Sequence, residues 1–415
     1  MAKKSQIDLS NEEIIEKIGS SKVLWVDMCI ASEVIPVLKN KMLLHAGPPL
    51  HPSNMCSAML NAIYGAIVYE GWAPNLKVAE ILVNSGVIKF DSAHNHSALG
   101  PMAGIISPSM PVMILENVTF GKRSFVTINE GLGTTLRFGA NDSTVIERLK
   151  WIEKVLYPML RDALYLSGPI DVTNIVARAV QRGDECHNRN KAATSLLFRK
   201  IASWMVKTTY SKTDISDAFF YIDSNDHFFL NLSMAIAKAT MEIAHEVHGG
   251  SIVTCMASNG VEFGIKISGT AEKWYTAPAG YAQGNYFKGF GLENANPIMG
   301  DSYILETTGL GGSAMASAPG IAKFIGGTVK ETIESTLEMY KITIAEHPLF
   351  KIPSMEFRGT PLGVDIRLIL ETGILPMINT GIAHKRAGIG QIGAGRFRPP
   401  MQCFEKAALD IGLIK

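Results

Sequence analysis

The stretch FFLNLSMAIAKATMEIAHEVHGGSIVTCMASNGVEFGIKIS, residues 228–268, contains both kinds of secondary structure on which the fold depends. Its first half has apolar residues at helical spacing and ends in a Gly-Gly pair, which predicts a buried core helix over residues 226–248. Polar residues such as Lys238 and Glu242 are too many for an unassisted membrane span. Its second half has two β-rich runs around Ser-Asn-Gly, residues 258–260, which predicts a β-hairpin.

The same switch between helical and strand patterns divides the rest of the chain. Residues 88–139 consist mainly of β-branched residues and Gly-rich loops, whereas residues 143–210 have helical spacing. Strand and Gly-rich loop signals return after residue 251. We therefore predict an α+β, multi-domain protein with mixed sheets: an N-terminal α+β domain over 1–142, a mostly helical middle domain over 143–250 and a C-terminal α+β domain over 251–415.

The composition is that of a core-rich protein. Apolar residues make up 47% of the 415 residues and charged residues 19%, which indicates surface covered in domain or subunit contacts and favours a homo-oligomer. Lys and Arg number 39 against 38 Asp and Glu, a balance that argues against binding of nucleic acid or an acidic membrane. The N-terminus has no apolar signal segment, and five dispersed cysteines argue against a disulfide framework. We expect a cytoplasmic protein.

The densest polar cluster is GDECHNRN, residues 183–190, between two predicted helices. Such a connection needs only a turn residue, Gly183, and a helix cap, Asn190, so its other side chains exceed what it requires. A histidine can move protons, a carboxylate can orient it, and an arginine can hold an anion. The alternative is a solvated loop with internal ion pairs. The predicted catalytic residues are His187, Asp184 and Glu185, and the predicted substrate-binding residues are Arg189, Asn188 and Asn190.

A second cluster, DSAHNHSALGPMAG, occupies residues 91–104. If residues 92–97 are extended, His94 and His96 project to the same face, as a metal pair would require. His-x-His is a weak metal signal by itself, so metal ligation, a metal-free substrate contact and structural hydrogen bonding stay open. We predict a site without metal or cofactor, in which His94 is catalytic and His96 binds substrate.

Two Gly-rich loops supply further candidates for anion binding. NEGLGTTLRFGA, residues 129–140, places Asn129, Glu130 and Arg137 around a turn whose N–H groups can face an anion. TGIAHKRAGIGQIGAGRFRPP, residues 380–400, has glycines in GxGxxG spacing, but its glycines and Pro pair predict an irregular chain in which no helix opens. We therefore predict no dinucleotide site and an anion-binding loop that uses Lys385, Arg386 or Arg396.

Seven strings in the sequence resemble the YlbE-like family: LLHAGPP, GPMAGIISPSMPV, NEGLGTTLRFGA, GDECHNRN, NGVEFG, GDSYILETTGLGG and GIGQIGAG. The resemblance implies an AllG-type subunit of oxamate carbamoyltransferase, which acts in anaerobic purine and allantoin breakdown. That enzyme converts oxalurate and phosphate into oxamate and carbamoyl phosphate, or the reverse. The resemblance also implies an FdrA-like protein as partner subunit, because members of the family are typically encoded beside such proteins.

A small anionic substrate of this kind would need three groups in the site. They are an arginine whose planar guanidinium, the positive fork, donates two parallel hydrogen bonds, a donor for the carbonyl oxygen, and a base. Arg137, Arg189 and Arg386 are loop-borne candidates for the fork. His94, Asn188 and Asn190 are candidate donors to the carbonyl oxygen, which gains charge during carbamoyl transfer. We predict His187 as the base that takes the proton from the attacking amide nitrogen.

Two other functions stay open. A metal-dependent amidohydrolase or lyase would use His94, His96 and a carboxylate. A non-catalytic assembly subunit would use the same polar loops to contact a partner. In a single-site enzyme the loops 91–104, 129–139 and 183–190 are expected to converge, because loops on a rigid scaffold commonly share one site.

Overall fold

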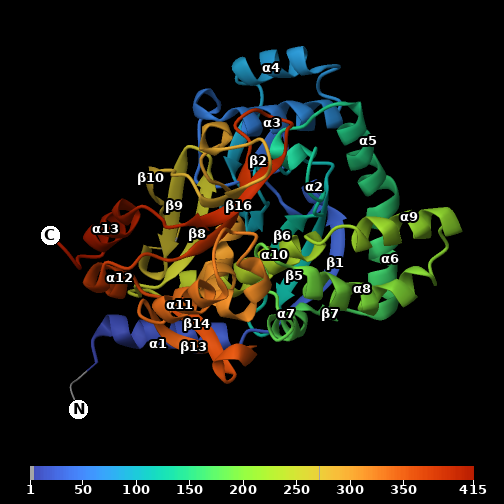
Figure 1. The fold of residues 1–415 in the computed structure, drawn as a ribbon. Helices are drawn as coiled ribbons and strands as arrows, with labels where there is room; N and C mark the ends of the chain where they lie inside the picture. Colours follow the sequence, from blue (N-terminus) through green and yellow to red (C-terminus); the bar gives the residue numbers. More distant parts are fainter. Residues whose placement is uncertain (1–3, 271) are drawn as a thin grey trace.

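The computed structural model describes residues 4–270 and 272–415, which form five sheets with helices around them (Figure 1). The largest sheet has the order β4-β6-β5-β1-β7, the next β10-β9-β8-β12 and the third β11-β16-β15; β13-β14 and β2-β3 are pairs. The strands are β1 Val23–Ile30, β2 Met42–His45, β3 Lys89–Ser92, β4 Ala98–Leu99, β5 Pro111–Asn117, β6 Lys122–Thr127, β7 Ile170–Asp171, β8 Val253–Asn259, β9 Glu262–Ile267, β10 Tyr275–Pro278, β11 Gln283–Tyr286, β12 Met299–Gly300, β13 Thr343–Ile352, β14 Arg358–Val364, β15 Ile378–Ala383 and β16 Gln391–Phe397. The α-helices are α1 Gln6–Gly19, α2 Ala31–Val34, α3 Ser57–Tyr69, α4 Leu76–Asn84, α5 Ser143–Trp151, α6 Tyr157–Ser167, α7 Val172–Val180, α8 Lys191–Met205, α9 Lys212–Asp223, α10 Phe228–Met241, α11 Val329–Met339, α12 Ile366–Thr372 and α13 Met401–Asp410.

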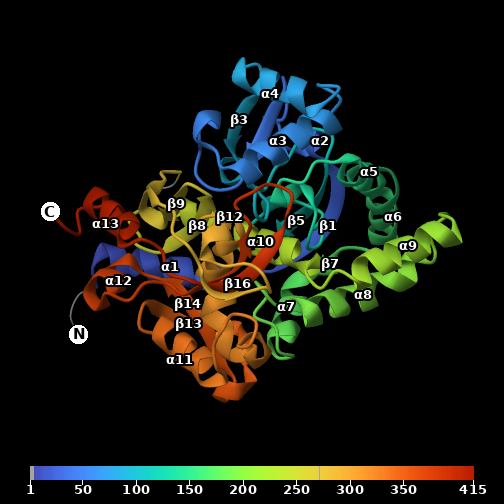
Figure 2. The ribbon, with the colours of Figure 1, turned by 45° about the horizontal axis from the view of Figure 1, so that its top comes forward.

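Helix α10 lies near the centre of the molecule (Figures 1 and 2), against β5, β6 and the 3₁₀ helix Ser302–Thr308. All 14 of its residues are buried, because its sequence is largely apolar on every face. The expected buried helix is confirmed, although it ends at Met241 and a 3₁₀ helix, Glu242–Glu246, follows it. No helix in residues 4–270 and 272–415, α10 included, has both the length and the hydropathy needed to cross a membrane.

Strands β8 and β9 form the antiparallel hairpin predicted at residues 258–260. Gly260 has a φ of 84° at the turn, a left-handed conformation that glycine adopts without a Cβ clash. Strand β12 pairs with the end of β8, where Met299 lies opposite Asn259. The residues that follow β12, Asp301 and Ser302, therefore start beside this hairpin, deep in the molecule.

The Gly-rich segment 380–400 is a hairpin of β15 and β16, so the prediction of an irregular chain is wrong. A Cβ on Gly395 would lie 2.5 Å from the backbone oxygen of Gln283, which shows that the glycines let β11 approach β16 closely. Glycines weaken the strand signal in a sequence even where packing requires them. Helix α13 begins only at Met401, after the GxGxxG spacing rather than inside it.

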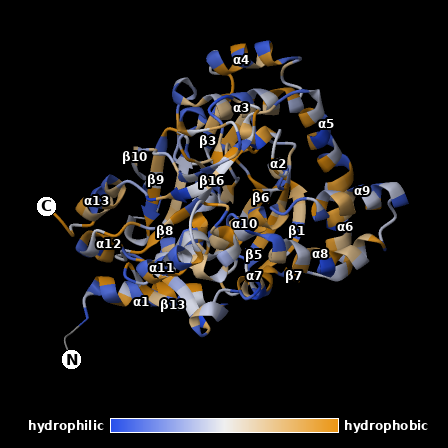
Figure 3. Ribbon diagram, viewed as in Figure 1, coloured by the Kyte–Doolittle hydropathy of each residue, from blue (hydrophilic) through white to orange (hydrophobic). Residues whose placement is uncertain are grey.

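Several separate sheets combined with helices confirm the predicted α+β class, and the largest sheet is mixed because β4 is parallel to β6 and the other pairs are antiparallel. One apolar cluster contains Met113 of β5, Leu160 of α6 and Leu232 of α10. Figure 3 shows the outer helices alternating between hydrophobic and hydrophilic residues, as helices with one buried face do. The proposed domain boundaries at residues 142 and 250 stay a prediction.

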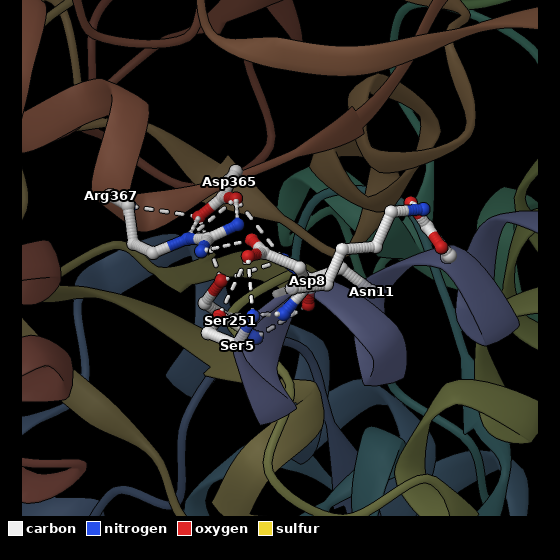
Figure 4. A network of polar contacts seen from close by, with 8 residues as sticks. Ser5, Asp8, Asn11, Ser251, Asp365 and Arg367 are labelled. Atoms are coloured by element: carbon white, nitrogen blue, oxygen red, sulfur yellow. Dashed lines mark hydrogen bonds and ion pairs between the residues drawn. The ribbon is translucent and has the colours of Figure 1, made fainter. Parts of the chain in front are cut away.

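Helix α1 is bonded to the C-terminal part of the chain by a network of polar side chains (Figure 4). Ser5 caps the helix by accepting a hydrogen bond from the backbone N–H of Asp8. Arg367 donates to Asp8, Nη1 to Oδ1 2.7 Å, and Asn11 donates to Asp365, Nδ2 to Oδ2 3.1 Å. These bonds fix the first helix against the start of α12.

Candidate functional site

The polar loop 183–190 joins α7 to α8 and is folded into the interior. Gly183 and Cys186 have φ angles of 94° and 63°, and the N–H of Cys186 donates to the carbonyl of Arg189 at 3.0 Å. Asp184 and Glu185 are 0% exposed. The loop is therefore a tight, buried turn rather than the solvated connection that was the alternative.

His187 of this loop is held by two residues of the 3₁₀ helix Ser302–Thr308. Its Nδ1 lies 2.9 Å from Oε1 of Glu306, and its Nε2 lies 2.9 Å from Oγ of Ser302. Burial disfavours the charged ring, but the carboxylates of Glu306 and Glu185 outweigh burial and raise the pKa of His187. Both ring nitrogens are engaged, so His187 exchanges protons with other groups only through this network.

The two carboxylates of the loop organise its ends. Asp184 accepts a hydrogen bond from the N–H of Ala193, Oδ2 to N 2.8 Å, and so caps α8. Asn190 occupies the predicted N-cap position of α8, but its side chain does not cap the helix. It donates instead to the carbonyl of His187, Nδ2 to O 2.8 Å. Burial raises the pKa of both Asp184 and Glu185 to about 7, which suits proton exchange near neutral pH.

His94 contacts the residue just before the same 3₁₀ helix. Its Nε2 lies 3.2 Å from Oδ1 of Asp301. Asp301 also accepts hydrogen bonds from the N–H groups of Gly47 and Gly100, at 2.7 Å and 3.0 Å. Because Asp301 directly precedes Ser302, the loops 91–104 and 183–190 meet at adjacent residues.

His94 and His96 do not share a face. Residues Ala93–His96 form a 3₁₀ helix rather than the extended segment assumed, and side chains in such a helix are about 120° apart. His94 is 1% exposed, whereas His96 pairs with Asp91 nearer the surface, Nε2 to Oδ2 2.8 Å. The two histidines thus do not form the pair that the metal hypothesis needs. No group of three His, Cys, Asp or Glu side chains in residues 4–270 and 272–415 is placed to hold a metal ion.

Polar side chains of the loop 129–140 form hydrogen bonds within the protein. Glu130 accepts hydrogen bonds from the N–H groups of Leu136 and Arg137, at 2.8 Å and 3.1 Å, so the anion that these groups face is its own carboxylate. Asn129 donates to Asn231 of α10, Nδ2 to Oδ1 2.8 Å. The side chains of Asn129 and Glu130, which were predicted to bind substrate, are therefore engaged in internal hydrogen bonds.

A cavity of about 310 Å³ lies beside the loop 183–190, a volume that suits a small ligand. Leu132 brings the loop 129–139 to the same cavity. The loop 91–104 does not line the cavity and is connected to the loop 183–190 through Asp301 and Ser302. The lining residues are Leu132, Asn188, Arg189, Asn190, Lys191, Asp226, His227, Gly320, Ile321 and Phe324.

Several buried polar atoms of the cavity residues have no hydrogen-bond partner within the described chain. They are Nδ2 of Asn188, Oδ1 of Asn190 and Nδ1 of His227. The side chain of Arg189 donates through Nε to the carbonyl of Gly183 at 2.9 Å and pairs with Asp184 at 3.6 Å, and no partner in residues 4–270 and 272–415 engages its two terminal nitrogens. Buried polar groups normally have partners, and these atoms therefore mark a place where a polar ligand would complete the hydrogen bonding.

His227, just before α10, is a candidate that the sequence analysis missed. Burial and the charge of Arg137 lower its pKa to about 4, and the backbone carbonyl of Asn188 accepts a hydrogen bond from the ring. The ring is thus neutral near pH 7, with Nδ1 left as an acceptor. Its sequence signal was the polar run Ser-Asn-Asp-His at 224–227, ahead of an apolar helix.

Asp301, Ser302 and Glu306 were also missed as site residues. All three lie in GDSYILETTGLGG, a string that carries family resemblance but no His, Lys or Arg. Their burial, at 0%, 3% and 1% exposed, is the property that makes them notable, because buried carboxylates are rare without a specific partner. That property could not be read from the string itself.

Lys385 and Arg386 lie in the turn between β15 and β16 and are exposed. The turn packs on the loop 129–140, since the N–H of Gly388 donates to the carbonyl of Phe138 at 3.0 Å. Neither basic side chain lines the cavity described above. Their role in anion binding stays a prediction.

The buried His94 should make the stability of the protein depend on pH. Burial opposes its charged form, but Cys255 and Asp301 raise its pKa from 6.5 to about 9. The folded-state pKa exceeds the unfolded one, so this stabilisation is complete below pH 6.5 and is lost as the pH rises to about 9. We expect wild type to lose on the order of 2 to 3 kcal/mol more than His94→Gln across this range.

Urea unfolding at pH values of about 6 and about 9 would measure this difference. His96→Gln is the matched control, because His96 lies two positions away and is partly exposed. Parallel pH slopes for wild type and His94→Gln would show that His94 does not titrate with folding.

Comparisons with known proteins agree with this architecture. The family described as "Oxamate carbamoyltransferase subunit AllG" matches residues 88–302. An Escherichia coli K12 protein named "Oxamate carbamoyltransferase subunit AllG" is 44% identical over 96% of each chain. "Uncharacterized protein YahG" of the same organism is 43% identical over 97% of this chain and 86% of its own.

A solved structure is similar as well. The crystal structure of a conserved protein of unknown function from Enterococcus faecalis V583 has a TM-score of 0.97 and 43% identity, with 98% of both chains covered. The resemblance to an AllG-type subunit seen in the sequence is therefore confirmed. This chain belongs to the family of the oxamate carbamoyltransferase subunit AllG.

Proposed function

We propose that this chain is a subunit of a carbamoyltransferase that transfers a carbamoyl group between carbamoyl phosphate and oxamate in anaerobic purine catabolism. The name of the relative, an oxamate carbamoyltransferase subunit, supports the reaction. The proposal includes an FdrA-like partner subunit, self-association and a cytoplasmic location. The non-catalytic assembly role is the outcome that the activity test below must exclude.

The unpartnered buried polar atoms of residues that line the 310 Å³ cavity carry the proposal. Oxamate has a carboxylate next to a carboxamide, so it needs a positive fork, a donor for the amide oxygen and an acceptor for the amide N–H. Arg189 offers the fork, Asn188 offers Nδ2 as a donor and His227 offers Nδ1 as an acceptor. The three residues line one cavity of a size that holds a small planar anion.

In the proposed step the amide nitrogen of oxamate attacks the carbamoyl carbon. A new C–N bond forms, the bond between the carbamoyl carbon and the phosphate oxygen breaks, and phosphate leaves with the electron pair. His227 takes the proton from the attacking nitrogen through Nδ1, which is in its basic form near pH 7. His187, the base predicted from the sequence, has both ring nitrogens engaged. We therefore assign the base to His227, and His187 with Glu185 would carry protons within the buried network.

Reconstitution tests the proposal. The purified chain and an FdrA-like subunit would be incubated, separately and together, with carbamoyl phosphate and oxamate, and oxalurate and phosphate would be measured. We expect both products in equal amounts from the mixture. Activity of the mixture that survives loss of the cavity residues Asn188 and His227 would mean that this chain only assembles the complex.

His227→Gln should lower kcat by about 100-fold, the lower end of the usual contribution of a general base. Glutamine keeps a polar side chain of similar reach but cannot accept the proton, so KM and the thermal midpoint should change little. The measurement is the rate of oxalurate formation at saturating substrate in the reconstituted complex. His51→Gln, at an exposed histidine, is the control, and an unchanged kcat in His227→Gln would remove His227 from the mechanism.

A further inference from the structure

Exposed apolar side chains lie on segments that are linked by contacts to one another and to the edge of the cavity, and we name this group the collar. Its apolar members are Leu132, Phe287, Phe290 and Ile389, exposed by 48%, 43%, 36% and 39%. Monomer surfaces usually carry single exposed apolar residues, whereas a contiguous group marks an interaction site.

Contacts between segments that are distant in sequence close the collar into a ring. Leu132 and Phe324 line the cavity itself, and the rings of Phe324 and Phe287 have centroids 6.4 Å apart. The ring of Phe290 lies 5.7 Å from that of His384. The turn after His384 returns to the start, because a Cβ on Gly390 would be 2.7 Å from the carbonyl oxygen of Gly133, next to Leu132.

The collar is also positively charged. Lys288, Lys323, Lys385 and Arg386 lie in the segments that build it, and all four are exposed. None of them has an ion-pair partner within residues 4–270 and 272–415. The collar segments 131–134, 287–294, 322–327 and 384–390 hold a single acidic residue, Glu293, although the whole chain has nearly equal numbers of both signs.

We infer that the collar is the docking surface of a different protein subunit, whose contact face has acidic side chains around an apolar centre and covers the cavity. Charge complementarity favours such a partner over a second copy, since a two-fold contact would place these cations against themselves. Coverage would also exclude water from carbamoyl transfer. The inference rests on the proposed function only in taking the chain to work within a complex.

The test is binding of the purified, full-length FdrA-like subunit to the whole chain, measured by titration and by size-exclusion chromatography with light scattering. We expect the double variant Lys385→Glu/Arg386→Glu to raise Kd by at least about 10-fold, since like charges would then face each other. Phe287→Ser should weaken binding as well. The matched control is Arg199→Glu/Lys200→Glu, an exposed Arg-Lys neighbour pair on α8, which should bind like wild type.

Each outcome decides between the possibilities. Wild-type Kd in both collar variants, with unchanged thermal midpoints, would overturn the inference, and so would a dimer of this chain that only the collar variants disrupt. Hydrogen exchange of residues 384–390 should slow in the complex and should stay fast if another face docks. A complex that depends on the collar but makes no oxalurate would refute the proposed function and leave the docking surface standing.

Discussion

Arg189→Lys should lower kcat/KM for carbamoyl transfer by about 30-fold to 1000-fold, equivalent to about 2 to 4 kcal/mol of transition-state binding. The Nε of Arg189 is anchored on the carbonyl of Gly183 at 2.9 Å, which leaves the two terminal nitrogens to hold a carboxylate side by side. Lysine supplies a point charge without this planar fork. The loss should therefore be nearly as large as in Arg189→Ala.

The measurement is kcat/KM in the reconstituted complex together with the thermal midpoint of each variant. Arg182→Lys serves as a control, because Arg182 lies near the same loop, is exposed, and donates through its side chain to the carbonyl of Arg178. Full activity in both Arg189 variants would make Arg189 a structural residue. So would a lower midpoint combined with unchanged activity per folded molecule.

Asp301→Ala should destabilise the protein by about 3 to 5 kcal/mol, the usual result of removing one partner from a buried charged group. Asp301 is 0% exposed and accepts hydrogen bonds from two backbone N–H groups besides its contact with His94. Alanine would leave these donors buried without an acceptor. It would also separate the segments around Gly47 and Gly100 from the residue that joins them.

Urea unfolding at neutral pH would measure this loss, with Glu246→Ala as the control. Glu246 also forms a long-range ion pair, with Lys122, but its side chain is 56% exposed, and such pairs contribute about 1 kcal/mol or less. A similar small loss in both variants would show that Asp301 does not hold the segments around Gly47 and Gly100 together.

The parts of the fold that sequence patterns predict are those in which neighbouring residues decide the outcome. The turn at 258–260 needs only Asn259 and Gly260 between two β-rich runs, and α10 needs only its own apolar sequence. The strands β15 and β16 were not predicted, because their glycines favour loops until β11 packs against them. Tertiary contacts decided the structure there.

The sequence likewise predicted only the part of the candidate site in which the residues are neighbours along the chain. The loop 183–190 could be found because its reactive side chains adjoin in sequence. Its partners could not, since Glu306 lies 119 positions from His187 and Ser302 lies 115 positions away. The position of His94 depended equally on a distant group, because its partner Asp301 lies far along the chain, whereas His96 pairs with the nearby Asp91.

The complete burial of α10 has a consequence for how a new chain folds. The helix packs on β5 and β6, made long before it, and on the 3₁₀ helix Ser302–Thr308, made after it. At about 5 to 20 residues per second, the roughly 60 residues between Met241 and Ser302 take about 3 to 12 s to synthesise. For those seconds a mostly apolar helix lacks one side of its covering, which exposes the new chain to aggregation and to chaperone binding.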